Sequence, residues 1–346
     1  MDTTGIHDEA LTRLHASGPE RLGRLSNHAP MAVEALAARG RATAVHRWLD
    51  LYARKLEEFP AAHACVTHEN WPQALGDPRR AADWIAYFHE QLAQRPWRDV
   101  LAAWWPRLLP GMYGGSTHPV IRVGHAVRGL LAQGGSGRVA AGATAPRLAE
   151  LAHGLGYWAA RHHPAPVAFP LPEAADAVRA LDAVPPIAVR DGGFPDRLAR
   201  VTRMPVWAAS PATPDEARVK LAELVRAAVH RYATHGHGEA TMLVHAATAP
   251  NAVLRALPAL PRRLWTPSLH AAWTASAAVT AMYAPREALP YRPHGTGSLT
   301  SEEVFERAAA HGDEHVIKFA DTALDVGDER ALDAVLHAVE LTEAPV

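Results

Sequence analysis

The sequence predicts a mainly α-helical protein. Apolar residues recur with helical spacing along most of the 346 residues, runs of β-branched residues are scarce, and no internal repeat is present. With 48% hydrophobic residues and 10 Trp, the chain has enough apolar material for a large core. We therefore expect a single large helical domain over residues 1–346. A Pro-rich irregular excursion near residues 163–214 is a possible boundary within it.

The first half of the chain predicts amphipathic helices separated by Gly and Pro. Ser26 or Asn27 can cap the second helix, because Pro30 then falls in its first turn, where proline is tolerated. The prolines at 106 and 110 should break the fifth helix, and a glycine-rich loop at 111–117 should lead into His118. The expected helices are 8–16, 28–38, 43–58, 78–94, 96–105, 118–132 and 146–162, with a flexible loop at 134–137.

The helical pattern resumes after residue 214. An apolar helix is expected to carry His245 in its middle and to continue after a kink at Pro250. Asp313 is a candidate N-cap for a helix that runs to Leu324 without Gly or Pro. The segment 268–283 is small-residue-rich and almost uncharged, which predicts a buried helix. The expected helices are 215–234, 239–250, 251–260, 268–283, 314–324 and 329–340.

Composition excludes several classes of protein. The net charge of −1 argues against a nucleic-acid binder, which would normally carry a basic surface. No run of 18 apolar residues predicts a membrane span, and the acidic first residues do not resemble a signal peptide. A single cysteine, Cys65, excludes an intrachain disulfide and any metal site built from cysteines. We expect a reducing, cytoplasmic location.

Common catalytic motifs are absent from the sequence. There is no His-Glu-x-x-His pattern for a zinc protease helix and no Gly-x-Ser-x-Gly elbow. No Gly-x-Gly-x-x-Gly run follows a strand, so a dinucleotide or flavin site of that type is not expected. Paired Glu-x-x-His motifs are also missing, which argues against a ferritin-like di-iron bundle.

Lys318 stands out because lysine is rare. Only three of the 35 basic residues counted as Lys plus Arg are lysines. Lys318 lies three residues after His315, so the two share a helix face, which also carries Phe319 and therefore looks inward. A lysine amine can lose its charge, whereas an arginine cannot. Alternatively, Lys318 extends to the surface or forms a salt bridge, and His315 is an ordinary core histidine.

Four histidines share a similar setting, at a helix start or on an apolar helix: His28, His118, His245 and His315. A buried neutral imidazole needs partners for both nitrogens, and these could be separate backbone carbonyls or one shared metal. A nitrogen-rich site suits iron, copper, nickel or zinc. A neutral Lys318 could then react with carbon dioxide, and the resulting carbamate would be an anionic oxygen ligand.

Two further histidines are candidates for acid–base roles. His125 follows His118 by seven residues and so shares its helix face. His270 lies on the expected buried helix near Trp273 and could line a cavity. Core packing is the alternative for both. The aromatic residues that could line a substrate pocket are Trp105, Tyr113, Trp158 and Trp273.

Four motifs in order resemble the questin oxidase-like family: the segments 25–31 (LSNHAPM), 118–121 (HPVI), 243–248 (LVHAAT) and 315–318 (HVIK). The resemblance extends from about residue 10 to residue 325. This chain departs from the fungal pattern at Gly124-His125, where Gly-Tyr is expected. The family includes fungal enzymes that open anthraquinone-type rings by oxidation. The resemblance implies a mononuclear non-haem Fe(II) site whose ligands are His28, His118, His245, His315 and a carboxylated Lys318.

From the residues and the resemblance together we expect a metal-dependent oxygenase. It would cleave the ring of a small aromatic or quinone substrate of polyketide type with dioxygen, with His125 or His270 moving protons and an external reductant as one source of electrons. Two alternatives stay open: a zinc-type metallohydrolase that uses a carboxylated lysine, and a non-catalytic helical binding protein. Neither the substrate, the choice between mono- and dioxygenation, nor the oligomeric state follows from the sequence.

Overall fold

The computed structural model describes residues 3–133, 143–294 and 299–345, so the loop expected at 134–137 lies outside the described residues. Helix makes up 67% of the structure and strand 5%, which confirms the mainly α class. No described helix has both the length and the apolar character that a membrane crossing requires.

The chain divides into two compact units. The first unit comprises Met1–Pro164 and Arg255–Pro261, and the second comprises Ala165–Leu254 and Arg262–Val346. The first change of unit, after Pro164, falls inside the stretch 163–214 where the sequence suggested a boundary. The single domain over residues 1–346 stays a prediction.

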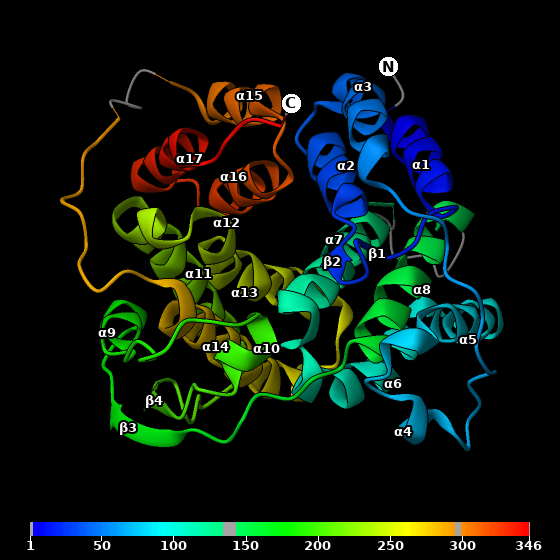
Figure 1. The fold of residues 1–346 in the computed structure, drawn as a ribbon, viewed down its shortest axis with the longest axis horizontal. Helices are drawn as coiled ribbons and strands as arrows, with labels where there is room; N and C mark the ends of the chain where they lie inside the picture. The colour runs from blue at the N-terminus through cyan, green and yellow to red at the C-terminus, as the bar shows by residue number, and fades with distance from the viewer. Residues whose placement is uncertain (1–2, 134–142, 295–298, 346) are drawn as a thin grey trace. The chain divides into compact units, whose positions relative to one another are not determined.

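Helices predominate in the described part of the first unit, which also contains one short hairpin (Figure 1). The strands β1 (Glu20–Arg21) and β2 (Leu25–Ser26) pair antiparallel and lead into α2. Its helices are α1 (Thr3–Leu14), α2 (Ala29–Ala38), α3 (Ala42–Tyr52), α4 (Trp71–Ala74), α5 (Ala81–Gln94), α6 (Trp97–Leu108), α7 (His118–Gln133) and α8 (Ala145–Ala160), with short 3₁₀ turns at Ala53–Lys55, Pro78–Arg80, Leu109–Gly111, Gly114–Thr117 and Leu257–Ala259.

Helix α8 is at the centre of the first unit and packs against α5 and α7. Glycine allows the close approach of α8 to α5, because a Cβ added at Gly156 would lie 2.7 Å from the backbone nitrogen of Ile85 on α5. A Cβ at Gly154 would lie 3.0 Å from the Val123 side chain on α7. Trp84 and Trp104 then pack edge to face between α5 and α6, with ring centroids 5.5 Å apart.

The second unit contains longer helices and a two-stranded parallel sheet. The stretch after residue 164 forms strand β3 (Phe169–Glu173), which pairs in parallel with β4 (Arg203–Val206). Its helices are α9 (Ala177–Asp182), α10 (Phe194–Leu198), α11 (Pro214–His235), α12 (Ala240–Leu243), α13 (His245–Ala256, whose last two residues belong to the first unit), α14 (Trp265–Tyr283), α15 (Ser301–His311), α16 (Glu314–Val326) and α17 (Glu329–Leu341), with 3₁₀ turns at Gly236–Gly238 and Arg262–Leu264.

Helix α11 packs against α14 and α17, and α16 packs against α15 and α17. Figure 1 shows α15, α16 and α17 grouped together at the orange-to-red end of the chain. Helix α16 begins as its sequence indicates, because the Asp313 carboxylate accepts hydrogen bonds from the backbone N–H groups of His315 and Val316. This cap fixes the start of the helix that carries His315 and Lys318.

The break expected near Pro106 to Pro110 is confirmed, because α6 ends at Leu108 and a 3₁₀ turn follows at Leu109–Gly111. Two other expectations about helix boundaries were wrong. Pro250 does not kink the chain into two helices, since α13 runs through it. The Ala246 carbonyl, which would have bonded to an N–H at position 250, instead accepts a hydrogen bond from Ser276 Oγ at 2.8 Å. His245 begins α13 rather than lying in the middle of a helix, because the preceding helix α12 ends at Leu243.

Candidate functional site

His28 and His118 meet in the first unit. Their rings stack with centroids 4.3 Å apart and planes 22° apart. His28 is 4% exposed and His118 is 7% exposed, so both imidazoles are largely removed from water. Burial disfavours the charged form of an imidazole, and only the neutral form offers a nitrogen lone pair to a metal.

An unusual backbone conformation presents His118 at the start of α7. Gly115, Ser116 and Thr117 all have left-handed φ values, of 56°, 55° and 65°. This conformation is costly for residues other than glycine. The turn lets the Gly115 carbonyl accept a hydrogen bond from His118 Nδ1 at 2.8 Å. Since a carbonyl only accepts, Nδ1 carries the proton, and Nε2 is the nitrogen with the lone pair for a ligand.

His28 is positioned by its neighbours at the start of α2. The Tyr52 hydroxyl accepts a hydrogen bond from the backbone N–H of His28 at 2.9 Å. Asn27 Oδ1 accepts from the N–H of Ala29 at 3.0 Å, but the N-cap of α2 is His28, which makes no side-chain capping bond, so the expectation of Ser26 or Asn27 at this position was wrong. These contacts fix the backbone around His28.

The second unit holds His245, His315 and Lys318. The ring centroids of His245 and His315 lie 6.0 Å apart, and the planes are tilted by 44°. His245 is fully buried and His315 is 9% exposed. Burial, followed by the Lys318 charge, lowers the pKa of His315, which outweighs the opposite effect of Asp313. The His315 imidazole is therefore neutral near pH 7.

Lys318 is the most unusual residue of this group, because it is 1% exposed and lies in the middle of α16. Its Nζ has no hydrogen-bond partner among the described residues. An ammonium group buried in this way costs several kcal/mol, on the order of the effective desolvation penalty of one ion. Burial lowers the pKa of Lys318 to about 8, although Glu314 and Asp313 oppose the shift.

His125 is held by a buried ion pair in the first unit. Its Nδ1 lies 2.6 Å from Glu34 Oε2, and Arg128 donates to the same carboxylate. Burial lowers the pKa of His125, whereas burial alone would raise that of Glu34, which Arg128 and His125 hold well below its usual range. Because the carboxylate accepts, Nδ1 of His125 carries a proton and the tautomer is fixed.

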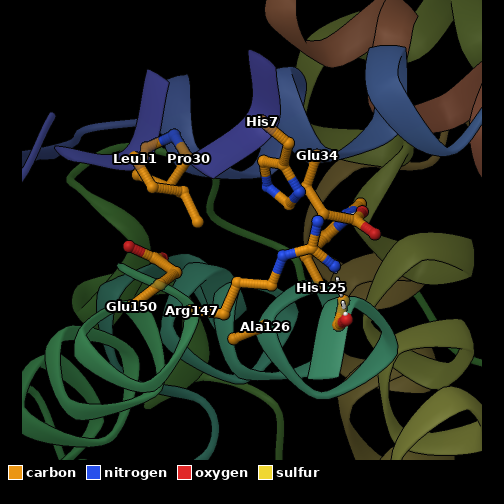
Figure 2. Close-up of a pocket in the computed structure, with 9 residues that line it drawn as sticks. His7, Leu11, Pro30, Glu34, His125, Ala126, Arg147 and Glu150 are labelled. Carbon is orange, nitrogen blue, oxygen red and sulfur yellow. Dashed lines mark hydrogen bonds and ion pairs between the residues drawn. The ribbon is translucent and has the colours of Figure 1, made fainter. Parts of the chain in front are cut away.

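Next to His125 lies a cavity of about 10 Å³. Figure 2 shows His7 and Glu34 approaching it from α1 and α2, with Arg147 and Glu150 on α8 opposite. This volume accommodates about one water molecule. The cavity is therefore too small for an aromatic substrate.

The other predicted residues have mainly structural contacts. His270 Nε2 lies 3.1 Å from the Ala208 carbonyl, and no described contact links it to His245 or His315. Trp105 and Trp158 are fully buried and pack edge to face with centroids 5.2 Å apart. Trp273 donates its indole N–H to the Pro205 carbonyl, and Tyr113 is 6% exposed.

Sequence reasoning missed the residues that position the histidines. Glu34 is separated from His125 by 91 positions, so no local pattern could connect them. Tyr52 acts on His28 through its hydroxyl group, and Gly115 acts on His118 through a backbone carbonyl. Of these residues, only Gly115 was indicated by the sequence, because the glycine pair before His118 predicts a turn.

The fold and these residues define a helical protein that buries histidines in both compact units, together with Lys318 in the second. The chain belongs to the questin oxidase-like family, whose model matches residues 25–323. That range includes all five residues that the resemblance implied as ligands. Membership indicates an oxidoreductase, an oxygenase that acts on an aromatic polyketide. No curated protein matches the chain.

Proposed function

We propose that this protein is an iron-dependent oxygenase that cleaves the ring of a small aromatic or quinone substrate with dioxygen. The proposed metal ligands are His28 and His118 from the first unit with His245, His315 and Lys318 from the second. The observation that carries the proposal is Lys318, a fully buried amine without a hydrogen-bond partner among the described residues. Family membership supplies the oxidative chemistry.

The charge of Lys318 and the position of the proton on His118 determine whether these side chains can bind a metal. An ammonium group has no lone pair and would repel a cation, so Lys318 can take part only after losing its charge. Carboxylation by carbon dioxide would convert its amine into a carbamate, whose oxygen is an anionic ligand. The tautomer of His118 leaves Nε2 as the nitrogen that can bind. Four imidazoles with one anionic oxygen suit Fe(II).

The bound iron would supply dioxygen activation, and the protein residues would control water, geometry and protons. The buried surroundings of the five ligands exclude bulk water. His125, whose orientation Glu34 fixes, is the first candidate to move a proton, and His270 is the second. An external reductant would provide electrons where the substrate does not.

The same ligands would also suit zinc, which would make the protein a metallohydrolase. Zinc has no redox chemistry, so such an enzyme would consume no dioxygen. The family favours the oxygenase, because it indicates an oxidoreductase. A non-catalytic binding protein would contain no stoichiometric metal, and a chelator would leave its stability unchanged.

The test combines metal content with oxygen consumption. Protein purified without chelator should contain about one iron per chain and should consume dioxygen with a hydroxylated anthraquinone-type substrate. Lys318→Ala should lose most of the iron, and acetate should restore part of it by replacing the carbamate oxygen. Lys220→Ala is the matched control, because Lys220 is a partly exposed lysine of the same unit.

Two results would contradict the proposal. Zinc in place of iron, with no oxygen consumed, would establish the hydrolase instead. Lys318→Ala with full iron content and full turnover would remove Lys318 from the site. Lys318→Met keeps the side-chain volume in the core, so it separates loss of metal from loss of folding.

A further inference from the structure

A second group of possible metal ligands lies on α17, in the second unit. His337 and Glu340 are three residues apart and share a helix face. His294 approaches them from the extended segment that follows α14. His294 Nδ1 lies 3.5 Å from Glu340 Oε1, and His337 Nδ1 lies 3.9 Å from Glu340 Oε2. One ligand atom from each residue lies within 4.8 Å of the others.

The backbone that carries His294 is fixed against α17 by a buried carboxylate. Asp333 is fully buried and accepts hydrogen bonds from the Tyr291 hydroxyl and, at 3.0 Å, from the N–H of His294. The Arg330 guanidinium lies 4.8 Å from the centre of the Tyr291 ring. Positions 330, 333, 337 and 340 therefore form one stripe along α17 that holds the segment 291–294. The backbone position of His294 is therefore fixed without a bound ligand.

We propose that His294, His337 and Glu340 bind one zinc-type divalent cation, with water in the remaining position. Tetrahedral zinc with bonds of about 2.0–2.2 Å places its ligand atoms about 3.3–3.6 Å apart. The distance from His294 to Glu340 already matches this, and small side-chain rotations bring in His337. Two imidazoles and a carboxylate favour zinc and other late transition metals over magnesium or calcium.

The exposure of the three residues suits an exchangeable surface ion. The side chains of His294 and His337 are 22% and 18% exposed, and that of Glu340 is 61% exposed. His337 Nε2 is buried without a partner among the described residues, so the ring is held by packing while Nδ1 faces Glu340. The bound cation would fasten the segment 291–294 to α17. This site is independent of the proposed oxygenase function.

Zinc binding to the native protein tests the site. Equilibrium dialysis against Zn²⁺, followed by elemental analysis, should show that the double variant His294→Gln/His337→Gln binds about one zinc per chain fewer than the wild type. His63→Gln, which replaces an exposed histidine in the first unit, should bind as much as the wild type. Because the comparison is between variants, metal at any other site cancels, and failure of the oxygenase proposal would not affect the result.

Cleavage by chymotrypsin after Tyr291 gives a second, structural readout. The Tyr291 hydroxyl must leave Asp333 before a protease can take up this segment. Zinc at about 100 times its Kd should lower the population of the open segment, and hence the cleavage rate, by up to about 100-fold in the wild type only. Equal zinc stoichiometry in wild type and double variant, or zinc protection that persists in a folded double variant, would overturn the proposal and leave two His–Glu ion pairs.

Discussion

At the scale of single residues, His153 shows how strongly the core of the first unit opposes charge. Its ring stacks on His15 with centroids 4.5 Å apart and meets the edges of Phe59 and His89, both at 5.6 Å. It is 3% exposed, and its Nδ1 has no hydrogen-bond partner among the described residues. Burial, followed by the Arg122 charge, lowers the pKa of His153 to about 2. The His153 ring is therefore neutral in the folded protein at pH values well below the usual pKa of a histidine.

This burial makes stability depend on pH. The folded pKa lies below the unfolded value of 6.5, so the contribution is complete above pH 6.5 and is lost as the pH falls toward 2. Between pH 6.5 and pH 5 the wild type should lose about 1.5 kcal/mol more free energy of unfolding than His153→Phe. Urea unfolding at both pH values measures the difference.

The control for this prediction is His63→Phe, which changes an exposed histidine and should keep the pH dependence of the wild type. Comparing slopes rather than absolute stabilities removes any packing effect of the larger ring. Identical slopes for His153→Phe and wild type would show that His153 has the same pKa in the folded and unfolded protein, and would contradict the prediction.

At the scale of elements, close approach between helices depends on individual glycines. Gly156 on α8 faces the backbone of Ile85 on α5, whereas Gly129 on α7 has no atom closer than 3.6 Å to an added Cβ. Both glycines lie within helices, where alanine is intrinsically favoured by up to about 1 kcal/mol. The packing around each glycine therefore decides whether replacement by alanine raises or lowers the free energy of unfolding.

Gly156→Ala should lower the free energy of unfolding by about 1–3 kcal/mol, because the new methyl group must push α5 away from α8. Gly129→Ala is the matched control and should be neutral or stabilising by less than about 1 kcal/mol. Thermal and urea unfolding of the two variants tests this. A stable Gly156→Ala protein would mean that α5 can shift without cost.

Helices were predictable from the sequence where their signals are local. The Asp313 cap and the amphipathic pattern after it gave α16, and α11 was expected within one residue at each end. Helix α15 was missed, although Thr300 and Glu303 form a capping box at its start. The β3–β4 pair was missed because partners more than 30 residues apart leave no local pattern, and β3 contains two prolines.

At the scale of the whole molecule, the candidate ligands are divided between the two units. His28 and His118 belong to the first unit, and His245, His315 and Lys318 belong to the second. The sequence could identify these residues, since each lies in a short motif or helix. It could not identify Glu34, Tyr52 or the Gly115 carbonyl, because their roles depend on packing between segments far apart in the chain.

If one iron binds both ligand sets, a substitution in either unit should remove it. His118→Ala in the first unit and His245→Ala in the second should each lose most of the bound iron and the oxygen consumption that depends on it. His153→Phe should keep both, because His153 lies outside the proposed ligands. Elemental analysis and an oxygen electrode measure the two properties, and circular dichroism confirms folding.

Full iron content in either His118→Ala or His245→Ala would show that the ligand sets act separately. Loss of iron in one variant only would assign the metal to that unit alone. Loss in both, with helix content unchanged, would support a single site that both units build.

The three lysines differ in exposure, so their chemical reactivity can report local opening of the second unit. Lys55 and Lys220 are partly exposed, whereas Lys318 is 1% exposed. An amine-reactive reagent should therefore label the first two quickly and reach Lys318 only when α16 separates from its neighbours. Counting labels by mass spectrometry over time would report how often this part of the second unit opens, without a mutation or an added dye.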